Sequence, residues 1–281
     1  MKFAMKFLLL FIIFSILFVL PSMVLPIPLD PKSQSGFNPV MLLVLLLVDL
    51  SCMVYLIKRL NLWGIKLYLA VALVFWGLQT FMTQIETWYF RAAMPAITDE
   101  VLLKLFLNPF ITTITFVPVA ILTLGKWNQP DTPEDHPNRK PTWKFLLALS
   151  ITYVIIYFLF GHFVAWQFEK VRTFYSGSPE LLGFTEQFQH TLHTYNFILP
   201  FQVFRGFLWL LCGLPLVLYL KGSRTEKVLA CVFMYAVLTS VQLIIDNPFM
   251  PTEVRIAHLL EVSTSNGLFG LLTGWILCRQ A

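Results

Sequence analysis

Residues 39–57 read PVMLLVLLLVDLSCMVYLI, an apolar run with one charged residue, Asp49, near its middle. Its length matches the ~20 mostly apolar residues that a helix needs to cross the hydrocarbon core of a bilayer. In hydrocarbon a spanning segment must satisfy its own backbone hydrogen bonds, which a helix does within one segment. This stretch therefore predicts a transmembrane helix.

Similar runs recur along the whole chain. Of all residues, 57% are hydrophobic and only 12% are charged, whereas soluble domains carry about 25% charged residues. The sequence therefore predicts an all-α, polytopic transmembrane helix bundle of about eight spans, with residues 1–281 forming a single integral membrane domain. The expected spans are roughly 7–25, 39–57, 67–89, 103–124, 144–166, 198–220, 228–245 and 257–278.

The first run follows Lys2 and Lys6 and resembles a signal peptide in its charge and apolarity. No Ala-x-Ala-like cleavage site follows it, because the next residues are Pro21-Ser22-Met23. We expect a retained helix, although a cleaved leader is the alternative and would leave the other spans unchanged.

The loops differ in positive charge from one side to the other. With eight spans, thirteen Lys and Arg fall in the loops and ends on the side of the N-terminus, and six fall on the opposite side. Cytoplasmic loops carry the excess of Lys and Arg. The bias predicts that both termini are cytoplasmic. The short loops and the absence of targeting signals favour a cell (inner or plasma) membrane, and an organelle membrane is the alternative. The bias also explains the net charge of +5 without nucleic acid as a partner.

Residues 126–143 are polar and proline-rich and predict a cytoplasmic linker between two halves, 1–125 and 144–281. Met94-Pro95 and Met250-Pro251 precede the last span of each half, and Tyr55-Leu56 resembles Tyr219-Leu220. These similarities suggest a 4+4 parallel internal repeat. Chance resemblance between apolar sequences is the alternative.

Ionisable residues inside the expected spans are informative, because a central charge costs ~2.5–3.5 kcal/mol even on a lenient insertion scale. Most of them fall near the outer membrane face, and Asp49 is the deeper exception. The spacing of Arg255, His258, Glu261 and Ser265 places them on one stripe of the last span. The candidates for ligand binding or proton coupling are Glu86, Arg205, Arg255, His258, Glu261, Ser265 and Asp49.

These residues allow several interpretations. They can line an outward-facing polar cavity that binds or transports a small solute or lipid, with Arg205 or Arg255 holding an anionic group and Glu86 and Glu261 exchanging protons. They can instead pair with one another and only hold helices in register. Arg205 is the natural ion-pair partner of Glu86 or Glu261.

A membrane-embedded enzyme is a further alternative, with His258 as a general base oriented by Glu261 and Glu86 close to them. Weak candidates for metal ligands are His258, Glu261, Glu86 and His162. A third alternative is a structural or assembly subunit that binds a membrane-protein partner, with Gly270 and Gly274 forming a close packing face. The sequence identifies neither a catalytic residue nor a cofactor.

Overall fold

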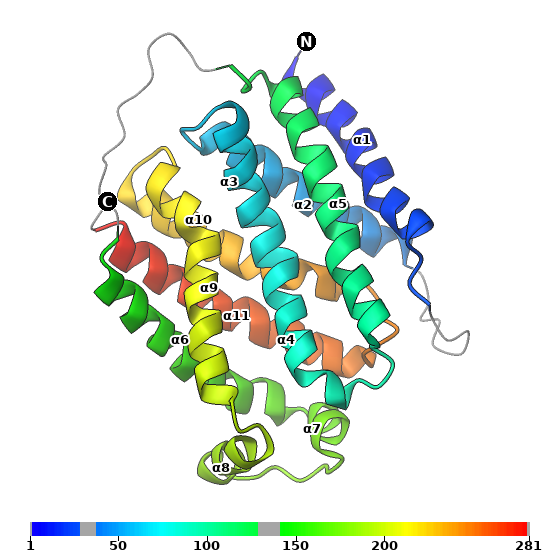
Figure 1. Cartoon of the computed structure of the whole chain (residues 1–281), viewed down its shortest axis with the longest axis vertical. Helices are drawn as coiled ribbons and strands as arrows, with labels where there is room; N and C mark the ends of the chain where they lie inside the picture. Colours follow the sequence, from blue (N-terminus) through cyan, green and yellow to red (C-terminus); the bar gives the residue numbers. More distant parts are fainter. Residues whose placement is uncertain (1, 29–37, 129–140, 280–281) are drawn as a thin grey trace.

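The computed structural model describes residues 2–28, 38–128 and 141–279. Long helices run between two ends of the molecule, and short helices gather at one of these ends (Figure 1). The α-helices are α1 (Phe3–Val24), α2 (Pro39–Arg59), α3 (Gly64–Trp76), α4 (Met82–Phe90), α5 (Asp99–Leu124), α6 (Trp143–Phe163), α7 (Glu169–Ser176), α8 (Phe184–Thr194), α9 (Ile198–Tyr219), α10 (Arg224–Ser240) and α11 (Thr252–Leu277). The short helices of other types are the π-helical η2 (Gly77–Phe81) and the 3-10 helices η3 (Arg91–Ala93), η4 (Ala165–Gln167) and η5 (Val241–Ile244).

Seven helical stretches among the described residues are long and apolar enough to cross a membrane. They are Phe3–Val24, Pro39–Arg59, Gly64–Ala93, Asp99–Leu124, Trp143–Gln167, Ile198–Tyr219 and Arg224–Ile244. The eighth expected span, α11, has 26 residues but is not among them, since Glu261 and the polar run 263–266 reduce its apolarity. It still packs along α10 and against α6. The chain is therefore an all-α helix bundle of a multi-pass membrane protein.

Local sequence explains where several helices begin and end. The Asn38 side chain accepts hydrogen bonds from the backbone N–H groups of Val40 and Met41, which caps α2. Ser223 and Glu226 form a capping box at the start of α10. Gly125, with φ of 74°, ends α5 in the left-handed conformation that glycine adopts without steric cost.

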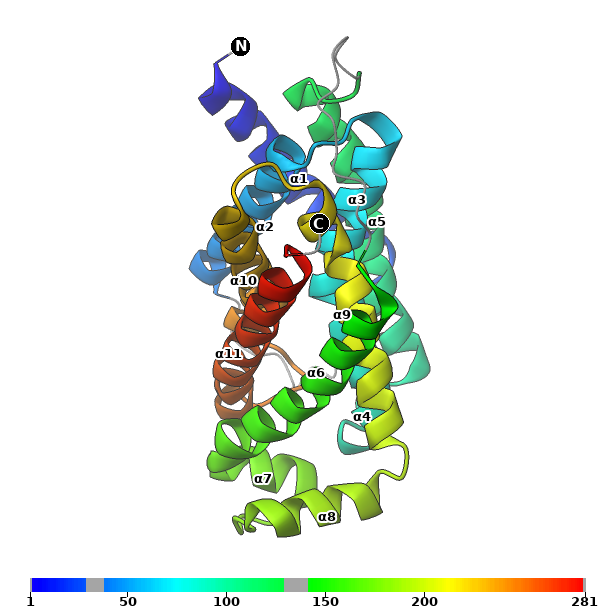
Figure 2. The same cartoon turned by 90° about the vertical axis from the view of Figure 1, so that its left-hand side faces the viewer.

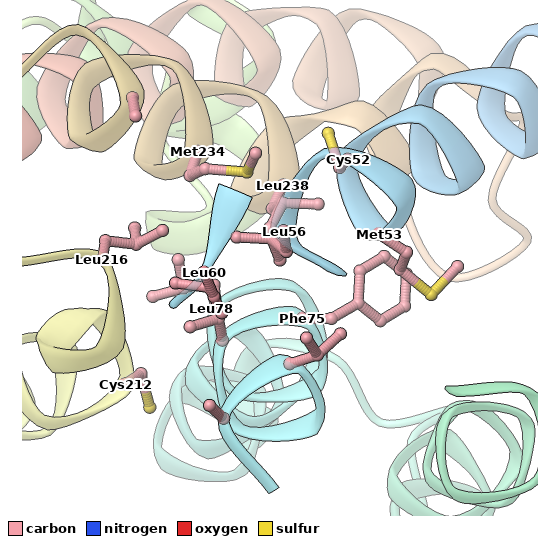
Figure 3. Close-up of a cluster of buried hydrophobic side chains, with 14 of the residues drawn as sticks. Cys52, Met53, Leu56, Leu60, Phe75, Leu78, Cys212, Leu216, Met234 and Leu238 are labelled. Atoms are coloured by element: carbon pink, nitrogen blue, oxygen red, sulfur yellow. The ribbon is translucent and has the colours of Figure 1, made fainter. Parts of the chain in front are cut away.

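The apolar core lies where α2, α3, α9 and α10 meet (Figure 3). Leu56, Leu60, Leu78 and Leu216 are fully buried there. Large apolar side chains such as Ile155 lie instead on the outer surface, 56% exposed. An apolar exterior of this kind suits lipid, which solvates such surfaces without cost.

The loops after α2 and α9 pair with each other at the end of the bundle opposite α7 and α8. Leu60 and Leu220 form an isolated antiparallel bridge. Asn61 N–H donates to the Tyr219 carbonyl over 2.7 Å, and Lys221 N–H donates to the Arg59 carbonyl over 2.9 Å. Four residues after each bridging leucine, α3 and α10 begin. This contact joins the two predicted halves, and the 4+4 repeat stays a prediction.

The central part of the predicted linker, residues 129–140, lies outside the described residues. At the other end of the bundle, α7 and α8 cross beneath α6 and α9 (Figure 2). Both lie between the fifth and sixth expected spans. Helix α7 was not expected. Arg172 ties it to the neighbouring loops, donating to the carbonyls of Trp166 and Pro179, both over 2.6 Å.

Candidate functional site

A cavity of about 250 Å³ lies at the end of the bundle that carries α7 and α8. Side chains of α4, α6, α9 and α11 form its walls, and residues of α7 and α8 complete the lining. Four of the residues singled out in the sequence, Glu86, Arg205, His258 and Glu261, line it, as does Ser265. Three helices distant in sequence thus bring the predicted cluster together.

An ion pair joins Arg205 of α9 to Glu86 of α4. Arg205 Nη1 donates to Glu86 Oε1 over 2.8 Å, and Nη2 donates to Oε2 over 2.7 Å. In this two-pronged geometry the planar guanidinium matches the carboxylate. The Arg205 side chain is 2% exposed and that of Glu86 is 33% exposed. The carboxylate is therefore the partner that faces the cavity.

Other groups hold Arg205 as well. Gln202, one turn earlier on α9, accepts a hydrogen bond from Nη1 over 2.9 Å. The rings of Tyr153 and Phe201 each lie 5.8 Å from the guanidinium carbon, within the range of a cation–π contact. Because Nη1 already donates to Glu86 and Gln202, an anionic ligand would have to compete with these groups. This geometry argues against Arg205 as the holder of an anionic group.

A second polar cluster joins α11 to α7. His258 Nδ1 lies 3.5 Å from Glu261 Oε2, and His258 Nε2 lies 3.0 Å from the Tyr175 hydroxyl oxygen. Ser265 Oγ donates to Glu261 Oε1 over 3.4 Å. A proton on Nδ1 would face Glu261, which leaves Nε2 to accept from Tyr175; this tautomer is inferred from the contacts. The imidazole is thus oriented between a carboxylate and a phenol.

Tyr175 lies on α7, outside the spanning helices. Burial raises the pKa of its phenol well above the usual value, and the carboxylates of Glu86 and Glu261 act in the same direction. Burial also raises the pKa of Tyr195, in the loop before α9. Tyr175 therefore stays protonated near neutral pH and acts as a hydrogen-bond donor toward His258.

Arg255 lies apart from the other residues of its stripe. Its Nη2 donates to Asp246 Oδ1 over 2.6 Å, and its Nη1 donates to the Leu243 carbonyl over 2.7 Å. The described lining of the cavity does not include Arg255. The first turn of α11 faces η5 and the loop after it, and Arg255 fastens the connection between α10 and α11. A role of Arg255 in ligand binding stays a prediction.

Asp49 also lies outside the described lining of the cavity. It is 1% exposed on α2 and accepts a hydrogen bond of 2.6 Å from Gln79 Nε2. Gln79 belongs to η2, a π-helical turn in the third span, and its carbonyl accepts a hydrogen bond of 2.8 Å from Gln242 Nε2. This contact gives the widened turn a partner for a backbone carbonyl. The Asp49 network therefore connects α2, η2 and η5.

The weak metal candidates do not form a common ligand set. Among the described residues, no group of three or more His, Cys, Asp or Glu side chains converges on one point. His162 lines the cavity, but its ring packs edge-on against Phe163 and Phe184, with centroid distances of 4.8 and 5.3 Å. The described side chains thus offer His258 and Glu261 as an adjacent pair without a third ligand.

Sequence reasoning missed several residues of the site. Tyr153, Tyr157 and Trp209 line the cavity, and Gln202 orients Arg205. Tyrosine and tryptophan are so frequent in this chain that none of them stands out. Gln202 carried a weak signal, because it is a polar residue one turn from Arg205 inside an apolar span.

No protein-family model, curated protein sequence or solved structure matches this chain. The helices and the cavity place it in the class of multi-pass α-helical membrane proteins.

Proposed function

We propose that this protein binds a small solute or the head group of a lipid in the cavity between α4, α6, α9 and α11. The observation that carries the proposal is the convergence of Glu86, Arg205, His258 and Glu261 on one hollow space. Buried polar groups that only held helices together would be expected to pack without leaving such a space. Here Glu86 is 33% exposed on its side chain and faces the hollow.

The proposal also includes the orientation of the protein in the membrane. The excess of Lys and Arg near the Leu60–Leu220 end favours that end as cytoplasmic, which places α7, α8 and the cavity on the outer side. Contacts at the basic end bring the loops together: Gly64 N–H donates to the Lys126 carbonyl over 3.1 Å, and Arg224 Nη2 donates to the Trp275 carbonyl over 3.0 Å. A cell (inner or plasma) membrane with cytoplasmic termini is the arrangement we propose.

Transport coupled to protons is a more specific version of this proposal. Glu86 and Glu261 are the carboxylates that line the described cavity, and each contacts a cationic or titratable partner. Glu86→Gln or Glu261→Gln should abolish pH-dependent binding or uptake. Unchanged pH dependence in both variants would remove the coupling, while binding itself could persist.

A membrane-embedded enzyme is the second candidate, and one contact favours it. His258 is bracketed by Glu261 and Tyr175 and faces the cavity instead of lipid. An imidazole can act as a general base when it is held in position within reach of the proton that it removes from the substrate. If His258→Ala leaves ligand binding intact but stops turnover of the bound molecule, catalysis replaces simple binding as the function.

A membrane-protein partner would need a surface other than the Gly270–Gly274 face. A Cβ at Gly270 would lie 2.6 Å from the Cys231 carbonyl oxygen, and one at Gly274 would lie 2.9 Å from the Val228 Cα. The small residues therefore allow α10 and α11 of this chain to approach closely. The Gly270–Gly274 face therefore gives no support to the assembly-subunit alternative.

The proposed function is tested by filling the cavity. Gly161 lines it, and a Cβ added there meets no heavy atom within 4 Å, so Gly161→Phe can place its ring in the hollow without displacing backbone. Native mass spectrometry of protein released gently from membranes should show a non-covalently bound mass in the wild type that disappears in Gly161→Phe.

The matched control is Ile155→Phe, which adds a ring on the exposed face of the same helix. It should retain the bound mass. A bare protein mass in the wild type, or an equal bound mass in Gly161→Phe, would overturn the proposed function and favour helix packing as the role of the polar cluster.

A further inference from the structure

The charged groups of the cavity do not balance. Glu86 and Glu261 contribute two carboxylates and Arg205 one guanidinium, so the lining keeps one negative charge when its histidines are neutral. The described lining contains no lysine. A partly enclosed, largely apolar space gives such an excess charge a larger effect than it has in water.

Glu261 is the carboxylate that remains weakly engaged. Glu86 accepts two hydrogen bonds below 3 Å from Arg205. Glu261, in contrast, has His258 Nδ1 at 3.5 Å and Ser265 Oγ at 3.4 Å, both longer than a strong charge-assisted hydrogen bond. Its side chain is 12% exposed. The excess negative charge is therefore located at Glu261, which lines the cavity.

The walls around these carboxylates are aromatic. Ten of the side chains that line the cavity belong to Phe, Tyr or Trp. Tyr157 and Tyr175 line the same cavity as Glu86 and Glu261. The face of an aromatic ring attracts a cation, and rings grouped around an ammonium are a common mode of recognition. The aromatic walls and the excess carboxylate thus both favour a positively charged ligand.

Size limits what can enter. The cavity of about 250 Å³ is smaller than the ~300–1,000 Å³ of pockets that enclose drug-sized ligands. It suits a compact polar group, whether this group is a free solute or the head of a lipid whose chains remain in the bilayer.

We infer that the group bound in this cavity is a compact ammonium or amine cation, held by Glu261 and the surrounding aromatic rings. This inference rests on the proposed function, and it names the chemical class of the ligand. It reverses the expectation from the sequence, in which Arg205 would hold an anion.

The test compares probes of one shape and different charge. Full-length protein in nanodiscs of uncharged lipid is titrated with choline, with its uncharged isostere 3,3-dimethylbutan-1-ol and with the anion 3,3-dimethylbutanoate. Hexadecyltrimethylammonium, below its micellar concentration, presents the same cation on a chain. Binding is followed by the fluorescence of Trp166 and Trp209, which line the cavity, and by calorimetry.

We expect the cation to bind at least about tenfold more tightly than the isostere, as a desolvated cation–π contact and a carboxylate allow. Glu261→Gln should remove most of this preference. Glu253→Gln, an exposed carboxylate in the first turn of the same helix, is the matched control and should keep it. Binding of free choline identifies a solute site, and binding of only the chain-bearing cation identifies a lipid head group.

Two results would overturn the inference. Equal binding of the isostere or the anion would contradict a cation site while leaving the cavity as a binding site. Absence of binding by both cations, in protein that still carries the bound mass lost in Gly161→Phe, would do the same. Failure of the proposed function is distinct, because it is measured by that bound mass and needs no added probe.

Discussion

Arg205 and Glu86, 119 residues apart in the sequence, are joined by two hydrogen bonds of 2.7 and 2.8 Å. In the sequence, α4 comes before the central linker and α9 comes after it, so the pair connects the two predicted halves. Arg205 is 1% exposed, and removing one partner of a buried pair leaves an uncompensated charge.

We predict that Glu86→Gln lowers the free energy of unfolding by about 3 kcal/mol, because the buried guanidinium of Arg205 loses its charged partner. The double variant Glu86→Gln/Arg205→Met should lose clearly less than the single variant, since it leaves no lone charge. Thermal unfolding in detergent measures both, with Lys170→Met on the exposed face of α7 as the control. Additive losses in the double variant would contradict a coupled pair.

Two helical glycines, Gly161 on α6 and Gly270 on α11, should respond oppositely to alanine. A Cβ at Gly270 would lie 2.6 Å from the Cys231 carbonyl oxygen, whereas a Cβ at Gly161 meets nothing within 4 Å. Alanine gains ~1 kcal/mol of helix propensity over glycine. We expect Gly161→Ala to unfold at the same or a higher temperature and Gly270→Ala at a lower one. Equal responses would show that α10 and α11 pack less closely than described.

The Asp49 network should tolerate loss of charge better than loss of its acceptor. Asp49→Asn keeps an oxygen that can accept from Gln79 Nε2, so we expect stability close to that of the wild type. Asp49→Leu leaves the buried Gln79 amide without this partner and should cost about 1–3 kcal/mol. Thermal unfolding of the two variants checks the difference. A severe functional loss in Asp49→Asn with unchanged stability would instead assign Asp49 a role that needs its charge.

Much of the architecture could be predicted from hydropathy, because lipid permits few alternatives to a helix in each apolar run. The convergence of Glu86, Arg205, His258 and Glu261 could also be anticipated, since charges in spans must face the bundle interior. The depth of each residue follows from its position in the run. The rotation of each helix about its own axis does not, which is why the pairing of Arg255 with Asp246 could not be predicted.

Features set by local backbone geometry escaped prediction. The π-helical turn at Gly77–Phe81 has no distinctive composition, and α7 is only eight residues long. The antiparallel bridge between Leu60 and Leu220 was not predicted either, because it depends on backbone hydrogen bonds between two loops.

The buried phenol of Tyr175 leads to a prediction about stability at alkaline pH. Its folded-state pKa is raised by burial, so the stability that it contributes is complete below its unfolded pKa of ~10 and decreases as the pH rises above that value. Tyr175→Phe cannot ionise. Above about pH 10, we therefore expect the melting temperature of the variant to fall less steeply with pH than that of the wild type. Parallel pH profiles would contradict a buried, protonated phenol.

The orientation makes a prediction that labelling can check. Thr225, at the start of α10, and Glu180, in the loop after α7, are both exposed and lie near opposite ends of the bundle. Native Cys52, Cys212 and Cys231 are buried, so a Cys278→Ser background leaves little competing reactivity. With cytoplasmic termini, a membrane-impermeant maleimide added to intact cells should label Glu180→Cys and spare Thr225→Cys until the cells are opened. The reverse pattern would turn the cavity toward the cytoplasm, and the ligand would then have to be sought among cytoplasmic solutes and inner-leaflet lipids.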